Sequence, residues 1–141
     1  MKYLIVILLI SAINLTASIE SVEQKIYASV LKALYGNDKR VAVWTDDQEK
    51  RVVLYHINNV KVVKDPQKAD ILFVYHNMDI NSKKPIFVGS YRLLKHYKDQ
   101  AIGGFYWQKG RPNLLFLGPN LQKLGMHVDK TLKQYIDEGL E

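Results

Sequence analysis

Cysteine is missing from all 141 residues of the chain. Its absence excludes a disulfide framework, a zinc site with thiolate ligands, a cysteine nucleophile and a lipid attached through cysteine. Histidine is scarce as well. His56, His76, His96 and His127 include no pair at the i, i+3 or i, i+4 spacing that places two imidazoles on one helix face. The sequence therefore predicts no metal site and no cofactor.

Recognisable catalytic motifs are equally absent. The sequence has no phosphate-binding loop, no dinucleotide fingerprint and no metalloprotease helix. Residues 89–92, Gly-Ser-Tyr-Arg, do not form the Gly-x-Ser-x-Gly elbow of hydrolases. The neighbouring acids Asp46-Asp47 and Asp137-Glu138 are explained by turn and tail positions. We therefore expect a protein that is not an enzyme.

The one long apolar run of the chain lies in its first residues. Lys2 precedes an apolar run from Leu4 to Ile10, and the small residues Ala17-Ser18 follow, which is the layout of a secretory signal. A helix that spans a bilayer needs about 20 apolar residues, and this run is shorter. We expect residues 1–18 to be a signal peptide and the protein to be periplasmic or secreted. Leu15 fits poorly before a cleavage site, which leaves an uncleaved, membrane-tethered form open.

Acidic residues are scarce in the second half of the chain, whose formal net charge as a whole is +6. Between Lys83 and Lys133, ten Lys and Arg residues stand against only Asp99 and Asp129. A basic segment of this kind binds nucleic acid, anionic lipid, cell-wall polymer or an acidic partner, or it solvates the outer faces of the fold. The export signal argues against nucleic acid and directs attention to partners in the envelope.

Residues 19–141 have the size of a single domain. Their apolar patterns predict an α/β fold with a mixed, mainly parallel sheet flanked by helices, ending in a β-hairpin and a C-terminal helix. Residues 51–57 fit either a helix capped by Asp46 or Asp47, or a strand. The other expected helices cover 22–35 (with Ser21 as N-cap), 91–97 and 121–136, and a bend near Gly125 is left open in the last of them. The expected strands cover 41–44, 60–63, 69–75, 85–88, 101–108 and 114–117.

The densest unusual stretch is Gly103–Asn113. Two glycines inside a strand indicate a bulge or the close approach of another backbone. Strand alternation places Phe105 and Trp107 on one face and Tyr106 on the other. Residues 109–113 then read as the loop of a hairpin.

Aromatic area beside two cations predicts a partner-binding surface at this hairpin. Its residues are Trp107, Lys109 and Arg111, with Arg92 as a secondary contact. Trp107 would supply buried area, and the cations would match an acidic partner. Core packing together with an ordinary solvated turn explains the same residues without a partner.

A second candidate site follows from the expected strand ends. His76 and Asn77 come directly after the clearest buried strand, and Ser90 and Arg92 come after the next strand. Ligands of open α/β sheets bind beyond the carboxyl ends of the strands, and a helix start with a hydroxyl and an arginine holds an anion. These four residues form the alternative, ligand-binding site. A plain N-cap role also explains Ser90.

The order of the later elements resembles the YfiR-like family of small exported bacterial proteins. The resemblance covers roughly residues 65–136 and is best in Gly103–Leu117 and Leu121–Leu132. It rests on a buried strand, a Gly-Ser turn into a helix, a Gly-Gly strand, a Gly-Arg hairpin and a closing Asn-Leu-Gln-Lys-Leu-Gly segment.

That resemblance implies an exported α/β protein that binds and restrains the outer part of a membrane-bound diguanylate cyclase, and that can self-associate. The thiol-based redox response of some members does not carry over to a chain without cysteine. The short segment between Val41 and Val63 also leaves little room for a surface that relatives build there. We expect a regulator of a membrane-bound signalling protein in the envelope. The alternative is a periplasmic small-molecule or anion-binding protein associated with transport.

Overall fold

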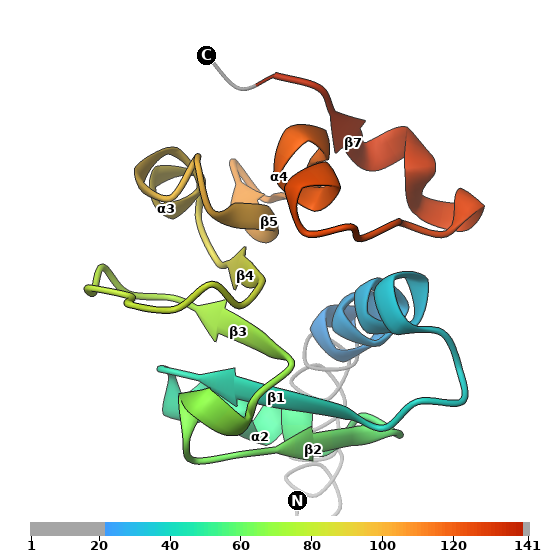
Figure 1. The fold of residues 1–141 in the computed structure, drawn as a ribbon, viewed down its shortest axis with the longest axis vertical. Coiled ribbons are helices and arrows are strands. Elements are labelled where there is room, and N and C mark those ends of the chain that lie inside the picture. Colours follow the sequence, from blue (N-terminus) through green and yellow to red (C-terminus); the bar gives the residue numbers. More distant parts are fainter. Residues whose placement is uncertain (1–21, 140–141) are drawn as a thin grey trace, which may run out of the picture.

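A single seven-stranded sheet with helices packed against it forms the fold in the computed structural model, which describes residues 22–139 (Figure 1). The expected signal peptide, residues 1–18, and the expected N-cap Ser21 lie outside the described residues. The strands are β1 (Val41–Thr45), β2 (Val60–Val62), β3 (Ile71–Val74), β4 (Ile86–Val88), β5 (Ala101–Gln108), β6 (Arg111–Leu117) and β7 (Ile136–Asp137).

The first described helix covers residues 22–35 and is called the N-terminal helix below. It ends where Gly36 takes φ +80° and its amide donates to the carbonyl of Lys32 at 2.8 Å, as the sequence predicts. The other α-helices are α2 (Gln48–Tyr55), α3 (Tyr91–His96) and α4 (Gly118–Lys123), and the 3-10 helices are η1 (Pro66–Lys68) and η2 (Lys130–Tyr135).

The strand order is β2-β1-β3-β4-β5-β6-β7. The first five strands in this order run parallel, β6 runs antiparallel to β5, and β7 runs parallel to β6. The expected α/β fold with a mixed, mainly parallel sheet is therefore confirmed. It follows from short continuous apolar runs such as β3, in which all four residues are buried, as in parallel strands covered on both faces.

Each face of the sheet has its own hydrophobic core. On one face the N-terminal helix, α2 and α4 pack over Val43, Phe73 and Phe87. On the other face α3 packs over Leu72 and Val88. Side chains alternate along each strand, so neighbouring residues pack into opposite cores. The core to which a strand residue belongs therefore identifies the face of the sheet on which it lies.

Residues 51–57, which the sequence leaves open, belong mainly to a helix. The Asp47 carboxylate accepts the amide hydrogen of Lys50 at 3.0 Å and caps α2, and Leu54 is buried beneath the helix. The cap and the buried leucine outweigh the weak helix propensity of Val52 and Val53.

The expectation of one closing helix over residues 121–136 is wrong. The helix α4 ends at Lys123, because Gly125 takes φ +64° and reverses the chain. An extended stretch follows, and Asp129 then caps the 3-10 helix η2 through the amide of Thr131. The chain closes with the short strand β7 rather than with a helix.

The loop expected at residues 109–113 is also too long. Strand β6 begins at Arg111, and only Lys109 and Gly110 form the turn, with φ +52° and +74°. Two consecutive left-handed residues make the tight hairpin turn that matches the twist of the strands. The hairpin extends past its neighbours, because β4 pairs with β5 only as far as Gly104 and β7 pairs with β6 only from Phe116.

Candidate functional site

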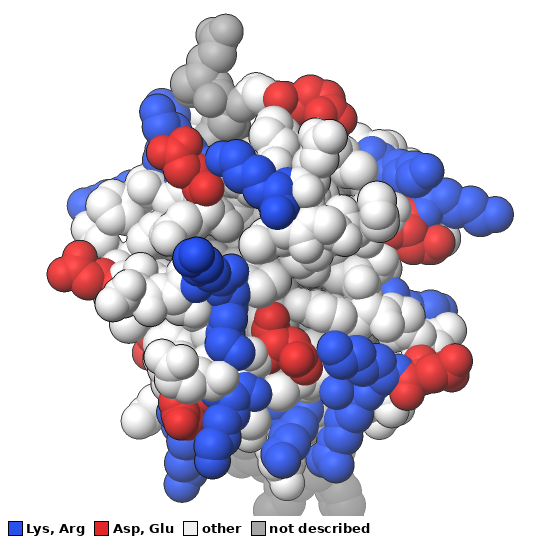
Figure 2. Space-filling view, in the orientation of Figure 1, with Lys and Arg blue, Asp and Glu red and all other residues white. Residues whose placement is uncertain are grey.

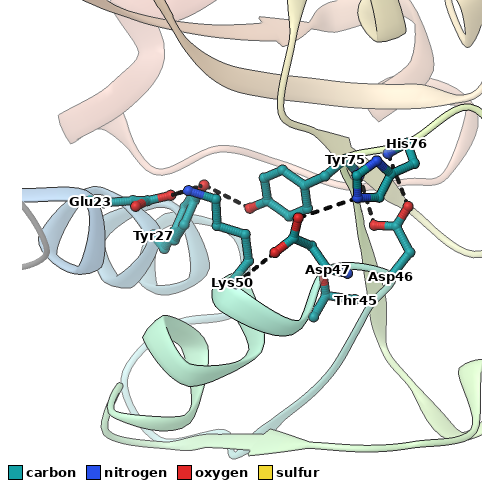
Figure 3. A network of polar contacts seen from close by, with 8 residues as sticks. All are labelled: Glu23, Tyr27, Thr45, Asp46, Asp47, Lys50, Tyr75 and His76. Carbon is teal, nitrogen blue, oxygen red and sulfur yellow. Dashed lines mark hydrogen bonds and ion pairs between the residues drawn. The ribbon is translucent and has the colours of Figure 1, made fainter.

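The strand order creates a topological switch point between β1 and β3. The chain passes from β1 through α2 to β2 on one side and returns to β3 on the other side. The crevice beyond the carboxyl ends of two such strands is where open α/β sheets bind ligands. Asp46 and Asp47 follow β1 at this point, and Tyr75 and His76 follow β3 (Figure 3).

Asp46 fastens the two strand ends to each other. Its carboxylate accepts the backbone amides of Tyr75 at 2.8 Å and His76 at 3.0 Å. The sequence predicts only a turn position or a helix cap for Asp46, because nothing in a single sequence shows that its carboxylate reaches across to another strand.

Asp47 adds a second contact with the same histidine. Its carboxylate lies 3.3 Å from Nε2 of His76 and accepts the amide of Lys50. Burial raises the pKa of Asp47, but the hydrogen bond from the Lys50 amide and the contact with His76 outweigh it and leave the pKa below its usual range. His76 itself is largely exposed, with 64% of its side-chain surface accessible.

Tyr75 follows β3 and packs beside the end of β4. Its ring lies against Gly89 so closely that a Cβ there would approach a ring carbon to 2.2 Å. Its hydroxyl donates to the hydroxyl of Tyr27 at 2.7 Å, and Tyr27 donates to Glu23 at 2.9 Å. Burial raises the pKa of both tyrosines far above the ordinary value, so both hydroxyls stay protonated and serve as donors.

Lys50 closes this polar network. Its ammonium group donates to Glu23 at 2.5 Å and lies 5.7 Å from the centre of the Tyr75 ring. Figure 3 shows these side chains converging from the N-terminal helix, α2 and the ends of β1 and β3. The network holds two helices against the sheet, and Glu23 and Lys50 at its outer end also line a surface cavity between the N-terminal helix and α2.

The four residues of the alternative ligand site occupy two neighbouring strand ends, as expected. Ser90 accepts the amide of Leu93 at 3.1 Å and so is the N-cap of α3. Asn77 and Arg92 are exposed. The Tyr75 ring packs against Gly89, the residue before Ser90. Within residues 22–139, no three His, Asp or Glu side chains gather to hold a metal ion.

The hairpin end presents Trp107, Lys109 and Arg111 to solvent, and Trp107 is 51% exposed. The register pairs Trp107 with Pro112 and Gln108 with Arg111, so Trp107 and Arg111 lie on opposite faces of the hairpin. The Trp107 ring lies 5.9 Å from that of Phe105, which belongs to the core under the N-terminal helix. The expected alternation of aromatic side chains is thus observed.

The opposite face of the hairpin meets α3. The rings of Tyr106 and Tyr91 lie 6.0 Å apart, and the ammonium group of Lys95 lies 5.4 Å from the centre of the Tyr91 ring. Arg92 is exposed on the same short helix. Tyr91 and Lys95 are not among the site residues predicted from the sequence, although their i, i+4 spacing indicates that their side chains can meet on one helix face.

Basic side chains have acidic neighbours at one end of the molecule, whereas the segment at the other end contains few acidic residues. Figure 2 shows Lys and Arg gathered over the lower part of the visible face, where β1 and β2 lie in Figure 1, with acidic side chains among them. At that end the ammonium group of Lys39 lies 3.7 Å from the Asp70 carboxylate. The hairpin and α3 instead belong to the segment whose only acids are Asp99 and Asp129.

The fold and these surfaces define a doubly wound α/β protein whose switch point is bridged by hydrogen bonds of its own side chains and whose projecting hairpin carries exposed aromatic and cationic groups. Comparison with protein-family models, with curated proteins and with solved structures finds no match. Among the described helices, none has both the length and the apolar content needed to cross a membrane.

Proposed function

We propose that this protein is an exported regulator that works by binding, and that it engages the outer part of a membrane-bound diguanylate cyclase or a similar envelope sensor. The observation that carries the proposal is the projecting hairpin end, which exposes Trp107 on one face, Arg111 on the other face and Lys109 in the turn between them. Large aromatic and arginine side chains are the residues that most often dominate binding energy in protein interfaces.

The switch point supports a binding role rather than a catalytic one. Tyr75 is hydrogen-bonded to Tyr27, and the carboxylates of Asp46 and Asp47 accept backbone amides. Ser90 accepts the Leu93 amide as the N-cap of α3, and among the described residues no hydrogen bond joins its hydroxyl to a histidine or a carboxylate that would activate it as a nucleophile. The alternative is a transport-associated site made of His76, Asn77, Ser90 and Arg92. These same contacts give it weaker support than the hairpin has.

Regulation of this kind needs no chemistry by the bound protein. A binding protein shifts its receptor between two states when it has a higher affinity for one of them. An acidic surface on the receptor would complement the hairpin cations and accelerate association.

The test is co-purification with the outer domain of a membrane-bound diguanylate cyclase from the same genome. Arg111→Glu should weaken the complex by at least about tenfold without lowering the melting temperature, because Arg111 is exposed and makes no core contact. Lys64→Glu, an equal charge reversal at the other end of the sheet, is the matched control and should bind as the wild type does. Unchanged binding of Arg111→Glu would remove the hairpin from the proposal.

A further inference from the structure

A surface cavity of about 290 Å³ lies at the amino-terminal edge of the sheet, away from both the switch point and the hairpin. It is bounded by the N-terminal helix, the start of β1 at Val41, the segment after α2 and the start of β2 at Val60. Its volume is near the lower end of the range for small-molecule sites, which is roughly 300–1,000 Å³.

The floor of this cavity is apolar. Leu31, Val41 and Ile57 are buried there, and Ala28 and Val60 are half-buried beside them. An apolar floor offers an organic ligand a surface on which its hydrocarbon part is removed from water.

The rim of the cavity is cationic. Lys25, Lys32 and Lys39 line it, and none of the described residues around it is acidic. Lys25 and Lys32 are seven residues apart and so lie on one face of the N-terminal helix. Lys39 is drawn toward Asp70 at 3.7 Å, whereas no described carboxylate pairs with Lys25 or Lys32.

Side-chain amides complete the rim and already satisfy nearby backbone carbonyls. Gln24 donates to the His56 carbonyl at 3.2 Å, and Asn59 donates to the Asn37 carbonyl at 3.1 Å. These carbonyls lie just beyond the ends of the N-terminal helix and α2, where helix dipoles place negative partial charge. Lys25 and Lys32 would also neutralise the negative partial charge at these helix ends. The experiment below separates this structural role from ligand binding.

We propose that this cavity binds a small organic anion, with the carboxylate held between Lys25 and Lys32 and a short apolar body resting on Leu31 and Ile57. The apolar floor distinguishes such a ligand from an inorganic anion, and the cationic rim distinguishes it from a neutral one. The site is independent of the proposed partner surface, since it shares none of its residues.

The test is a titration of the protein with hexanoate, followed by two-dimensional amide NMR. Saturable shifts should be confined to the cavity, at residues such as Leu31, Gly36 and Val60. The double variant Lys25→Gln/Lys32→Gln should weaken hexanoate binding by at least about tenfold, because it removes two charge-assisted contacts. Lys64→Gln, an exposed lysine outside the cavity, is the control and should leave the titration unchanged.

Two further probes and one further variant make each outcome decisive. 1-Hexanol and inorganic phosphate should both bind more weakly than hexanoate, and equal binding of either would overturn the proposal. Ala28→Leu fills the floor and should reduce hexanoate binding in a protein whose amide spectrum still shows the fold. A double lysine variant that melts at a lower temperature yet binds hexanoate normally would assign these lysines to the helix ends alone. No saturable shift in the wild type would also refute the site.

Discussion

At the scale of single residues, the Asp47 carboxylate both caps α2 and contacts His76. Because its pKa is lowered in the folded protein, the carboxylate stabilises the fold above the unfolded-state pKa of about 3.9. This contribution is lost as the pH falls through the lower pKa of the folded state.

Asp47→Asn should therefore flatten the acid end of the stability profile. Asparagine still caps a helix, but it does not titrate. Urea unfolding should show the free energy of unfolding falling more steeply between about pH 5 and pH 2 in the wild type than in the variant. The other carboxylates are common to both proteins, so equal slopes would show that Asp47 has no charge-dependent role.

Asn120 is the second residue, and its role is structural because its side chain is buried and hydrogen-bonded. It is 4% exposed, and its amide group donates to the carbonyls of Lys98 at 2.6 Å and Ala101 at 2.7 Å. Asn120→Ala leaves these carbonyls unpaired and should lower the free energy of unfolding by about 2–3 kcal/mol. Asn113→Ala is the control, because its amide bonds only the exposed carbonyl of Arg111, and it should change stability by less than about 0.5 kcal/mol. Similar losses for both variants in urea unfolding would contradict this reasoning.

At the scale of elements, the hairpin turn places a lysine where the backbone favours asparagine. Lys109 has φ +52° and precedes Gly110 at φ +74°. Asn-Gly is the preferred pair for this turn, so Lys109→Asn should raise the free energy of unfolding by up to about 1 kcal/mol. Gly110→Ala should lower it by about 1–2 kcal/mol, because a Cβ is disfavoured at positive φ. Thermal unfolding of both variants checks the two opposite signs, and shifts in the same direction would refute the turn geometry.

The same scale shows where a sequence pattern determines structure and where it does not. The strand expected over residues 69–75 is short and largely apolar, and the structure contains a doubly buried strand at its centre, Ile71–Val74. Leu121, Val128 and Leu132 have helical spacing, yet the segment contains the short α-helix α4 and the 3-10 helix η2 instead of one continuous helix. A single left-handed residue, Gly125, outweighs the periodicity of the whole segment.

The candidate sites also contain features that the local sequence predicts and features that it does not. Strand ends and turns are local, so the sequence placed His76 and Ser90 at neighbouring strand ends and identified Ser90 as an N-cap. The pairing of Tyr27 with Tyr75 joins residues that are 48 positions apart. The cavity beside Lys25 and Lys32 is likewise assembled from distant segments, and no spacing in the chain indicates it.

At the scale of the whole molecule, the sheet separates the surface into two sides, one over each hydrophobic core. The projecting hairpin is the place where both sides are accessible at once, because β4 and β7 do not extend along it. Trp107 belongs to the side of the N-terminal helix and Arg111 to the side of α3. A partner that contacts both residues must therefore enclose the hairpin end rather than lie flat on one side.

This geometry predicts a specific order of effects on binding to the outer domain of the proposed cyclase partner. Trp107→Ala and Arg111→Glu should each weaken the complex by at least about tenfold, since both residues would be enclosed. Arg92→Glu should have a smaller effect, because Arg92 lies on α3 at one side only. Titration calorimetry of the three variants measures the order, with melting temperatures as the folding control. A large effect of Arg92→Glu together with normal binding of Trp107→Ala would instead place the partner flat against α3, and the enclosed hairpin would then be wrong.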